Sequence, residues 1–232
     1  MGLNEDEETT GKDSKGKEIA AGNRRRITRP PLNFLAILYE HRIAVDTSRP
    51  DQLCKRLYGG VYLKPNQLKY YVDKKTNKNC FVLYARELII VHGGNPQYWE
   101  WENDKGTSGE DIEVAKLSAV CWIDIKGYIR TINLSPGTLY EIVFEVKKFV
   151  GWANSNFSFD LVIKPQHSKA LTRTESFERK LLDDWFELRV GEFWMSPEYV
   201  GNMEFGLEQH DGSWKSGLVV KCAIIRPKEV TT

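Results

Sequence analysis

The sequence lacks any long hydrophobic run and any strong net charge. Its 232 residues carry a formal net charge of +1, and the mean hydropathy is −0.46. No apolar stretch approaches the roughly 18 residues that a membrane span requires, and the first residues, MGLNEDEETTGKDSKGKEIAAG, contain no apolar core of a secretory signal. We therefore expect no membrane insertion, no export by a signal peptide and no global field that attracts nucleic acid.

Cysteine and histidine are few and scattered. The four cysteines are Cys54, Cys80, Cys121 and Cys222, each among apolar or aromatic neighbours. This favours buried, reduced thiols over a disulfide framework. The four histidines show no HxH or HExxH spacing and no zinc-finger distance to a cysteine. The sequence therefore predicts neither a metal nor another cofactor.

Catalytic motifs are also missing. Gly11–Glu18, GKDSKGKE, is close to a phosphate-binding loop, but Glu18 stands where a Ser or Thr must meet magnesium. There is no GxSxG motif. Neighbouring carboxylates such as Asp183 and Asp184, or Glu204 and Glu208, lie in loop or strand sequence without a sign of perturbed ionisation. We predict that the protein is not an enzyme.

The chain divides into three predicted parts. Residues 1–31 have no aromatic residue and mixed charges, which predicts a disordered tail; its cluster Arg24–Arg26 is compatible with nuclear import or phosphate binding, but such a run is more often neither. Residues 32–68 form a short helical or extended segment, with helices expected at Asn33–Leu38 and at Thr47–Leu57, the latter capped by Ser48. Residues 69–230 form the main domain.

The main domain shows hydrophobic residues at every second position. The alternating segments are Tyr140–Val146, Phe157–Ile163, Phe186–Val190, Met203–Leu207 and Leu218–Ile224. They indicate half-buried strands, and Ser-Pro-Gly and Asp-Gly turn sequences separate some of them. Many strands without intervening helices predict an all-β fold, an antiparallel β-sandwich.

Tryptophan is abundant, with seven residues. Trp122 and Trp152 look like core residues. Trp99 and Trp101 differ because they follow the loop sequence Gly-Gly-Asn-Pro and, two apart, face the same way in an extended segment. An aromatic side chain on a loop of a rigid scaffold is a common binding element.

An exposed indole suits the C–H face of a sugar while carboxylates and amides accept its hydroxyl groups. The same face can stack on nucleobases, but that requires a basic groove, and this stretch carries Glu100, Glu102 and Asp104.

Several motifs, in order, resemble the plant phloem protein 2 family, which includes the phloem lectins and the tobacco-type lectin domain. They are KYYVDKKTNKNCFVLYARELIIVHGGNPQYWEW, VCWIDIKGYIRTINLSPGTLYEIVFEVK, WFELRVGEF and DGSWKSGLVVKCAIIRP. The resemblance runs from about Leu57 to Pro227. It implies a jelly-roll-like lectin sandwich in the cytoplasm or sieve element that binds N-acetylglucosamine oligomers (chitin fragments) or N-glycan cores. Residues 1–56 show no F-box pattern.

The resemblance also implies site residues. It places Trp99 at the sugar-stacking position and His92 where the family has a second stacking tryptophan. Glu208, or its neighbour Gln209, corresponds to one acidic contact, and Asn202 falls at a second. His92 and Asn202 depart from the lectin pattern, so sugar binding is expected to be weaker or altered.

The roles of two further tryptophans follow less directly. Trp101 is equally compatible with a second stacking platform and with the core, and Trp214 of the WKSG motif is expected to be scaffold. Members of the family often dimerise, and some associate with phloem filaments or RNA. The resemblance therefore implies a homodimer and, in addition to glycoproteins, phloem filament protein or RNA as partners. The alternative function is a structural, protein-binding or RNA-binding phloem protein with a degraded sugar site.

Overall fold

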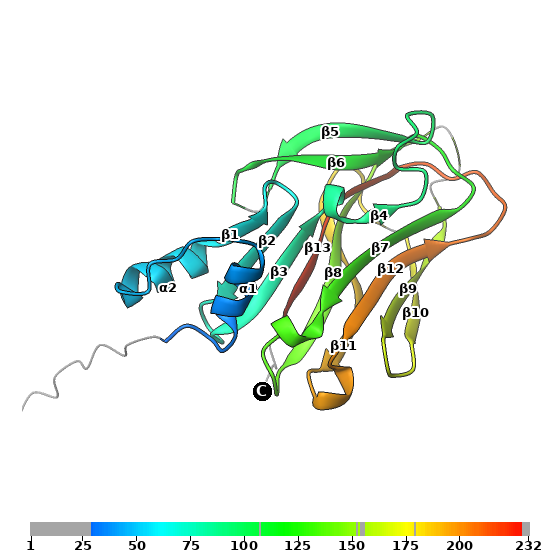
Figure 1. Ribbon diagram of the computed structural model, residues 1–232. Helices are drawn as coiled ribbons and strands as arrows, with labels where there is room; N and C mark the ends of the chain where they lie inside the picture. The colour runs from blue at the N-terminus through cyan, green and yellow to red at the C-terminus, as the bar shows by residue number, and fades with distance from the viewer. Residues whose placement is uncertain (1–28, 107, 152, 154–155, 179, 229–232) are drawn as a thin grey trace, which may run out of the picture.

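The computed structural model describes residues 29–228 except residues 107, 152, 154–155 and 179 (Figure 1). Residues 1–28 of the predicted tail, with its arginine cluster, and the predicted core residue Trp152 lie outside the described residues. None of the helices within the described part is long and apolar enough to cross a membrane.

The larger of two antiparallel sheets has eight strands. They are β1 (Val61–Lys64), β2 (Leu68–Asp73), β3 (Lys78–Tyr84), β5 (Trp99–Lys105), β6 (Asp111–Leu117), β8 (Leu139–Lys148), β11 (Trp185–Trp194) and β13 (Leu218–Pro227). The order is β1-β2-β3-β13-β6-β5, and β13 also pairs with β8, which pairs with β11. The long strand β13 is therefore the centre of this sheet.

The smaller sheet has five strands in the order β10-β9-β12-β7-β4. They are β4 (Ile89–Ile90), β7 (Ile123–Arg130), β9 (Ser158–Pro165), β10 (Leu171–Ser176) and β12 (Asn202–Gln209). Three short 3₁₀ helices, η1 (Ala85–Glu87), η2 (Thr131–Asn133) and η3 (Pro197–Tyr199), lie between strands.

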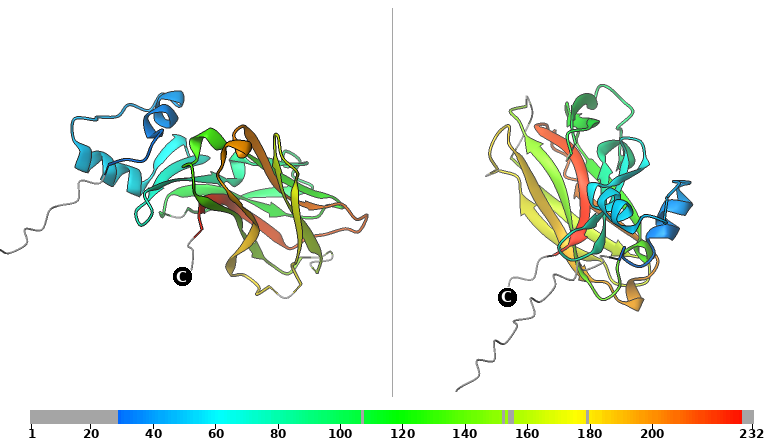
Figure 2. Two further views of the ribbon diagram at one scale, coloured as in Figure 1. Left: turned by 90° about the horizontal axis from the view of Figure 1, so that it is seen from below. Right: turned by 90° about the vertical axis from the view of Figure 1, so that its left-hand side faces the viewer.

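The two sheets pack face to face and enclose one hydrophobic core (Figure 2). Phe144 of β8 and Phe205 of β12 meet across the layers with ring centroids 5.9 Å apart. A Cβ on Gly127 of β7 would lie 2.3 Å from the Phe205 ring, so this position requires glycine. The predicted antiparallel β-sandwich is confirmed, because alternating residues of strands in both sheets face this core.

Both helices lie at one side of the sandwich and contribute buried residues to its hydrophobic core (Figure 2). α1 (Phe34–Glu40) lies where a helix is predicted. α2 (Pro50–Gly59) begins three residues later than predicted, and its N-cap is Arg49. Ser48 is not the cap, because its backbone N–H and its hydroxyl group donate to Asp46 instead.

The predicted domain boundary at residue 69 stays a prediction. The preceding segment, residues 32–68, contains the two helices and also β1, which pairs with β2 in the larger sheet. None of the four cysteines forms a disulfide: Cys121 is half-buried and the other three are buried.

Candidate functional site

Trp99 is a core residue and not an exposed platform. Its side chain is 1 % exposed, and its indole N–H donates to the carbonyl oxygen of Val91 at 3.1 Å. The physical reason is register: Trp99 lies opposite Leu117 of β6, and both side chains face the inside of the sandwich. The expected stacking role of Trp99 is therefore wrong, because neither face of the ring is open to a sugar.

Trp101 is half-buried at the margin of the same core. Its indole N–H donates to the carbonyl oxygen of Gly93 at 2.8 Å. The guanidinium carbon of Arg86 lies 3.6 Å from the ring centroid, so Arg86 covers one face of the indole. A shallow hollow of about 480 Å³ lies beside it. Of the two roles considered, the structure favours packing.

His92 is exposed in the turn between β4 and β5, where the chain crosses from the smaller to the larger sheet. Its φ angle of 62° lies in the left-handed region, and its ring centroid is 5.1 Å from that of Tyr98. The preceding Val91 N–H donates to the carbonyl oxygen of Asp124. His92 therefore lies beside the first residues of β7, at one end of the smaller sheet.

The site residues that the family resemblance implies on β12 lie at the two ends of this strand. Glu208 and Gln209 end the strand, whereas Asn202 begins it opposite Arg130. Asn202 and Glu208 are six residue steps apart along the strand, which is about 20 Å. Asn202 cannot share a small ligand with Glu208. The Gln209 amide is engaged, because its Nε2 donates to the Ser158 carbonyl and its Oε1 accepts from the Asp211 N–H.

Glu208 belongs to a row of carboxylates across the outer face of the smaller sheet. It lies directly opposite Asp124 of β7 and Asp160 of β9, so the three side chains share one face. Lys164 donates to Glu208 at 2.7 Å, and Lys126 donates to Asp124 at 3.0 Å. The hydrogen bond to Glu208 raises the pKa of Lys164. These lysines offset the repulsion of like charges.

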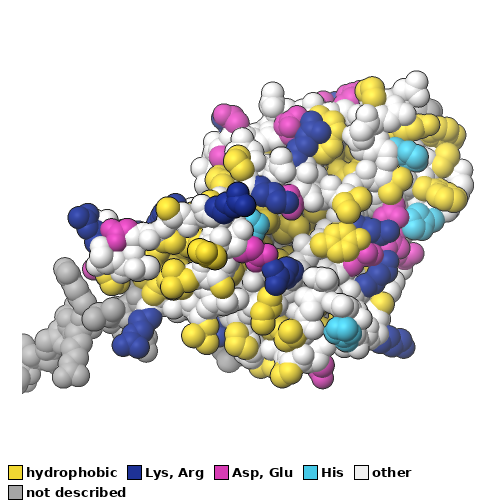
Figure 3. Space-filling view, in the orientation of Figure 1, with side chains coloured by type: hydrophobic (Ala, Val, Ile, Leu, Met, Phe, Trp, Pro, Cys, Tyr) yellow, Lys and Arg dark blue, Asp and Glu magenta, His cyan; other side chains and the backbone are white. Residues whose placement is uncertain are grey.

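An exposed indole at this end of the sheet belongs to Trp122, which the sequence had suggested as core. Trp122 is 60 % exposed, and the His210 ring lies 6.0 Å from it at an angle of 55°. The Nε2 of His210 is 3.6 Å from Asp124 Oδ2. We call Trp122, Asp124, Glu208 and His210 the Trp122 cluster. In Figure 3, histidine, hydrophobic and charged side chains gather at the right-hand end of the molecule, where β7 begins and β12 ends.

Lys215 holds this end of the molecule together. It is fully buried, and its ammonium group donates to the carbonyl oxygens of Cys121, Asp211 and Ser213 and to the Asp211 carboxylate, at 2.6 to 3.1 Å. The backbones of Val120 and Lys215 also exchange two hydrogen bonds. The segment that carries Trp122 is therefore fixed to the loop between β12 and β13. Trp214 of this loop is 50 % exposed, and its expected scaffold role stays a prediction.

The Trp122 cluster is suited to binding a polar ligand with an apolar face. It combines an exposed indole, two carboxylates on adjacent strands and an imidazole on a rigid scaffold. Asp124 Oδ1 is buried and has no hydrogen-bond partner among the described residues. No group of three or more His, Cys, Asp or Glu side chains in the described part could hold a metal ion.

Comparison with known proteins agrees with the motifs. Residues 78–227 match the family profile described as Phloem protein 2. The chain belongs to the phloem protein 2 family. It is 37 % identical over 204 residues to Protein PHLOEM PROTEIN 2-LIKE A1 of Arabidopsis thaliana, covering 86 % of this chain and 82 % of that protein. It is 36 % identical over 179 residues to a lectin of Luffa acutangula, covering 77 % and 85 %.

Among solved structures, a family 22 carbohydrate-binding module of Clostridium thermocellum Xyn10B superposes with a TM-score of 0.37 and 12 % identity, over 60 % of this chain and 91 % of that module. This similarity is too low to inform the site of this phloem protein 2 member.

One signal in the sequence indicates that Trp122 is exposed. In the segment WIDIK, Ile123 and Ile125 are the inward residues, so Trp122 alternates onto the polar side with Asp124 and Lys126. His210 carried no such signal, because it lies just after β12 in a loop.

Proposed function

We propose that this protein is a lectin that binds N-acetylglucosamine oligomers or N-glycan cores through the Trp122 cluster. The observation that carries the proposal is the exposed indole of Trp122 beside the row of carboxylates. The C–H face of a pyranose packs on the indole, while Asp124 and Glu208 accept hydrogen bonds from hydroxyl groups. Mechanistically this is binding without chemistry.

The N-acetyl group adds two interactions that this arrangement can supply. Its amide N–H is a donor for a carboxylate, and its methyl group adds apolar surface against an aromatic ring. His92, from the neighbouring turn, extends the surface on the β4 side of Asp124. The membership of the family and the similarity to a named lectin support the proposal.

The site is open and small, so each binding event is expected to be weak. Dimerisation or clustering would then raise the apparent affinity through effective concentration. An RNA-binding role is disfavoured at this surface, because Asp124, Glu208 and Asp160 would repel phosphates.

Titration calorimetry with chitotriose tests the proposal. We expect saturable heat in the wild type and at least a roughly tenfold loss of affinity in Trp122→Ala, which corresponds to about 1.4 kcal/mol. The matched control is Trp194→Ala, because Trp194 is 55 % exposed and ends β11 near the start of β12, far from the cluster.

Equal affinity in the wild type and Trp122→Ala would contradict the proposed site. If neither protein binds chitotriose or an N-glycan core, the lectin function itself is wrong. Retention on RNA that falls steeply with salt would then support the alternative function.

A further inference from the structure

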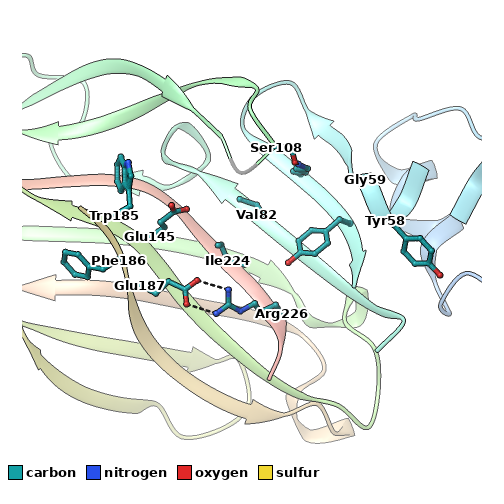
Figure 4. Close-up of a pocket in the computed structure, with 12 residues that line it drawn as sticks. Tyr58, Gly59, Val82, Ser108, Glu145, Trp185, Phe186, Glu187, Ile224 and Arg226 are labelled. Carbon is teal, nitrogen blue, oxygen red and sulfur yellow. Dashed lines mark hydrogen bonds and ion pairs between the residues drawn. The ribbon is translucent and has the colours of Figure 1, made fainter. Parts of the chain in front are cut away.

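A groove crosses the outer face of the eight-stranded sheet, on the side away from the smaller sheet. It measures about 550 Å³ and joins a second hollow of about 620 Å³, with Tyr71 and Arg226 lining both. The part of its lining that the sheet supplies comes from β2, β3, β13, β8 and β11. Because these five strands are neighbours, the groove extends over four inter-strand steps, about 19 Å. We call it the sheet groove (Figure 4).

The floor of the sheet groove is apolar. Val82 of β3 and Ile224 of β13 lie opposite each other in the sheet and belong to a second hydrophobic cluster, separate from the core. Tyr58, from the end of α2, stands on one side of this floor, and Trp185 of β11 stands on the other (Figure 4). The ammonium groups of Lys221 and Lys147 lie 4.3 and 4.8 Å from the centre of the Trp185 ring and fix it in place.

The charged side chains along the groove are already paired. Arg226 binds Glu187 through two hydrogen bonds, at 2.6 and 2.8 Å, and also binds Glu141. Glu145 pairs with Lys221 at 3.0 Å. Lys69 donates to Ser108 and lies 3.5 Å from Glu110. The hydrogen bonds to Glu187 and Glu141 raise the pKa of Arg226 despite its burial.

This pairing restricts the chemistry of a ligand. A charged ligand would have to displace an existing ion pair, which costs more than it returns in a partly buried site. A wholly apolar ligand would desolvate Glu145, Glu187 and Arg226 without offering hydrogen bonds. A neutral ligand with many hydroxyl groups and apolar ring faces leaves the ion pairs intact and still offers hydrogen bonds to the charged groups. An extended peptide is disfavoured, because the groove crosses the strands and offers no open strand edge for backbone pairing.

We infer that the sheet groove is a second binding site, for an uncharged oligosaccharide chain of several sugar units. The sugar rings lie over Val82 and Ile224, between Tyr58 and Trp185, and their hydroxyl groups bond to carboxylate oxygens of Glu145 and Glu187. This site is independent of the Trp122 cluster, which belongs to the other sheet. A single chain would then hold two saccharides on different faces and could cross-link glycans without dimerisation.

Gly59 allows the groove to be filled without disturbing the fold. It ends α2 and lines the groove, and a Cβ added there meets nothing within 4 Å. Gly59→Leu therefore places a side chain in the groove. The matched control is Gly94→Leu, because Gly94 is also open to an added Cβ and lies outside the groove, beside Trp101.

The test follows the indole N–H signals of ¹⁵N-labelled protein during titration with chitotetraose and, separately, cellotetraose. Trp185 reports on the groove, and Trp122 reports on the cluster. In the Trp122→Ala background we expect the Trp185 signal to shift with at least one of the two sugars. The shift should be lost in Trp122→Ala/Gly59→Leu and retained in Trp122→Ala/Gly94→Leu.

A Trp185 signal that stays in place with both sugars, or one that shifts equally in the Gly59→Leu protein, would overturn the second site. These outcomes are separate from failure of the lectin proposal. If only the Trp122 signal moves in the wild type, the Trp122 cluster is supported and the sheet groove is rejected. If only the Trp185 signal moves, the sheet groove is supported and the Trp122 cluster is rejected.

Discussion

Trp99 and Trp122 lie on either side of β6 in the chain, yet their surroundings are opposite. Trp99 is buried between the sheets with its indole N–H bonded to the backbone. Trp122 is mostly in solvent, beside carboxylates and an imidazole. Both belong to segments that alternate between the core and the outside. The difference between them is which alternating position the indole occupies.

The comparison shows that the local register, more than the residue type or the loop that precedes it, decides the role of an aromatic side chain here. Trp99 pairs with the inward Leu117, so it contributes to stability. Trp122 precedes the inward Ile123, so it faces solvent and is free of a packing role. A substitution of Trp99 should therefore lower stability, whereas a substitution of Trp122 should lower sugar binding and leave stability nearly unchanged.

The largest expected effect is on stability at Trp99. Trp99→Ala should lower the free energy of unfolding by about 3–5 kcal/mol, because it removes a fully buried aromatic side chain. Trp122→Ala should change it by less than about 0.5 kcal/mol, as for other surface substitutions. Urea denaturation of both variants checks this. Similar losses at the two positions would contradict the comparison.

A smaller effect is expected where Lys215 holds the Trp122 segment. Lys215→Met keeps most of the side-chain volume but leaves the carbonyl oxygens of Cys121 and Ser213 without their donor. We expect a loss of about 2–3 kcal/mol in the free energy of unfolding, together with faster amide hydrogen exchange in residues 119–122. Unchanged exchange in that segment would show that Lys215 does not fix Trp122.

The smallest effect concerns pH. Hydrogen bonds from Lys215 and Ser213 lower the pKa of Asp211 to about 2. Because the folded pKa is below the unfolded value of about 3.9, the stabilisation is present above that value and is lost as pH falls through about 2. The free energies of unfolding of the wild type and Asp211→Asn should therefore converge between about pH 5 and pH 2. The effect is modest, because the Asp211 side chain is largely exposed. A constant difference across that range would contradict it.

Much of the fold was predictable because alternation is a local signal. The alternating segments at Tyr140–Val146 and Met203–Leu207 lie in β8 and β12, and both supply core residues of a sandwich. The start of α2 was not predictable in this way, because Ser48 bonds to Asp46 in place of the helix. The pairing of β13 with β3, β6 and β8 depends on contacts between distant segments, which no local pattern contains.

The site was less predictable than the fold. His92 and Glu208 do lie at one end of the smaller sheet, which the family motifs suggested, but Asn202 is at the other end of β12. The loop before Trp99 suggested exposure, yet that loop crosses between the sheets and its tryptophan fills the core. His210 and Asp124 meet only through the pairing of β7 with β12, which sequence spacing does not reveal.

The most direct test of the Trp122 cluster is a chitotriose titration of the wild-type protein followed through its assigned indole ¹⁵N–H signals. We predict that the Trp122 signal shifts progressively to saturation, while the signals of Trp99 and of the remote Trp194 stay in place. A titration in which Trp99 shifts and Trp122 does not would contradict the assignment of the site.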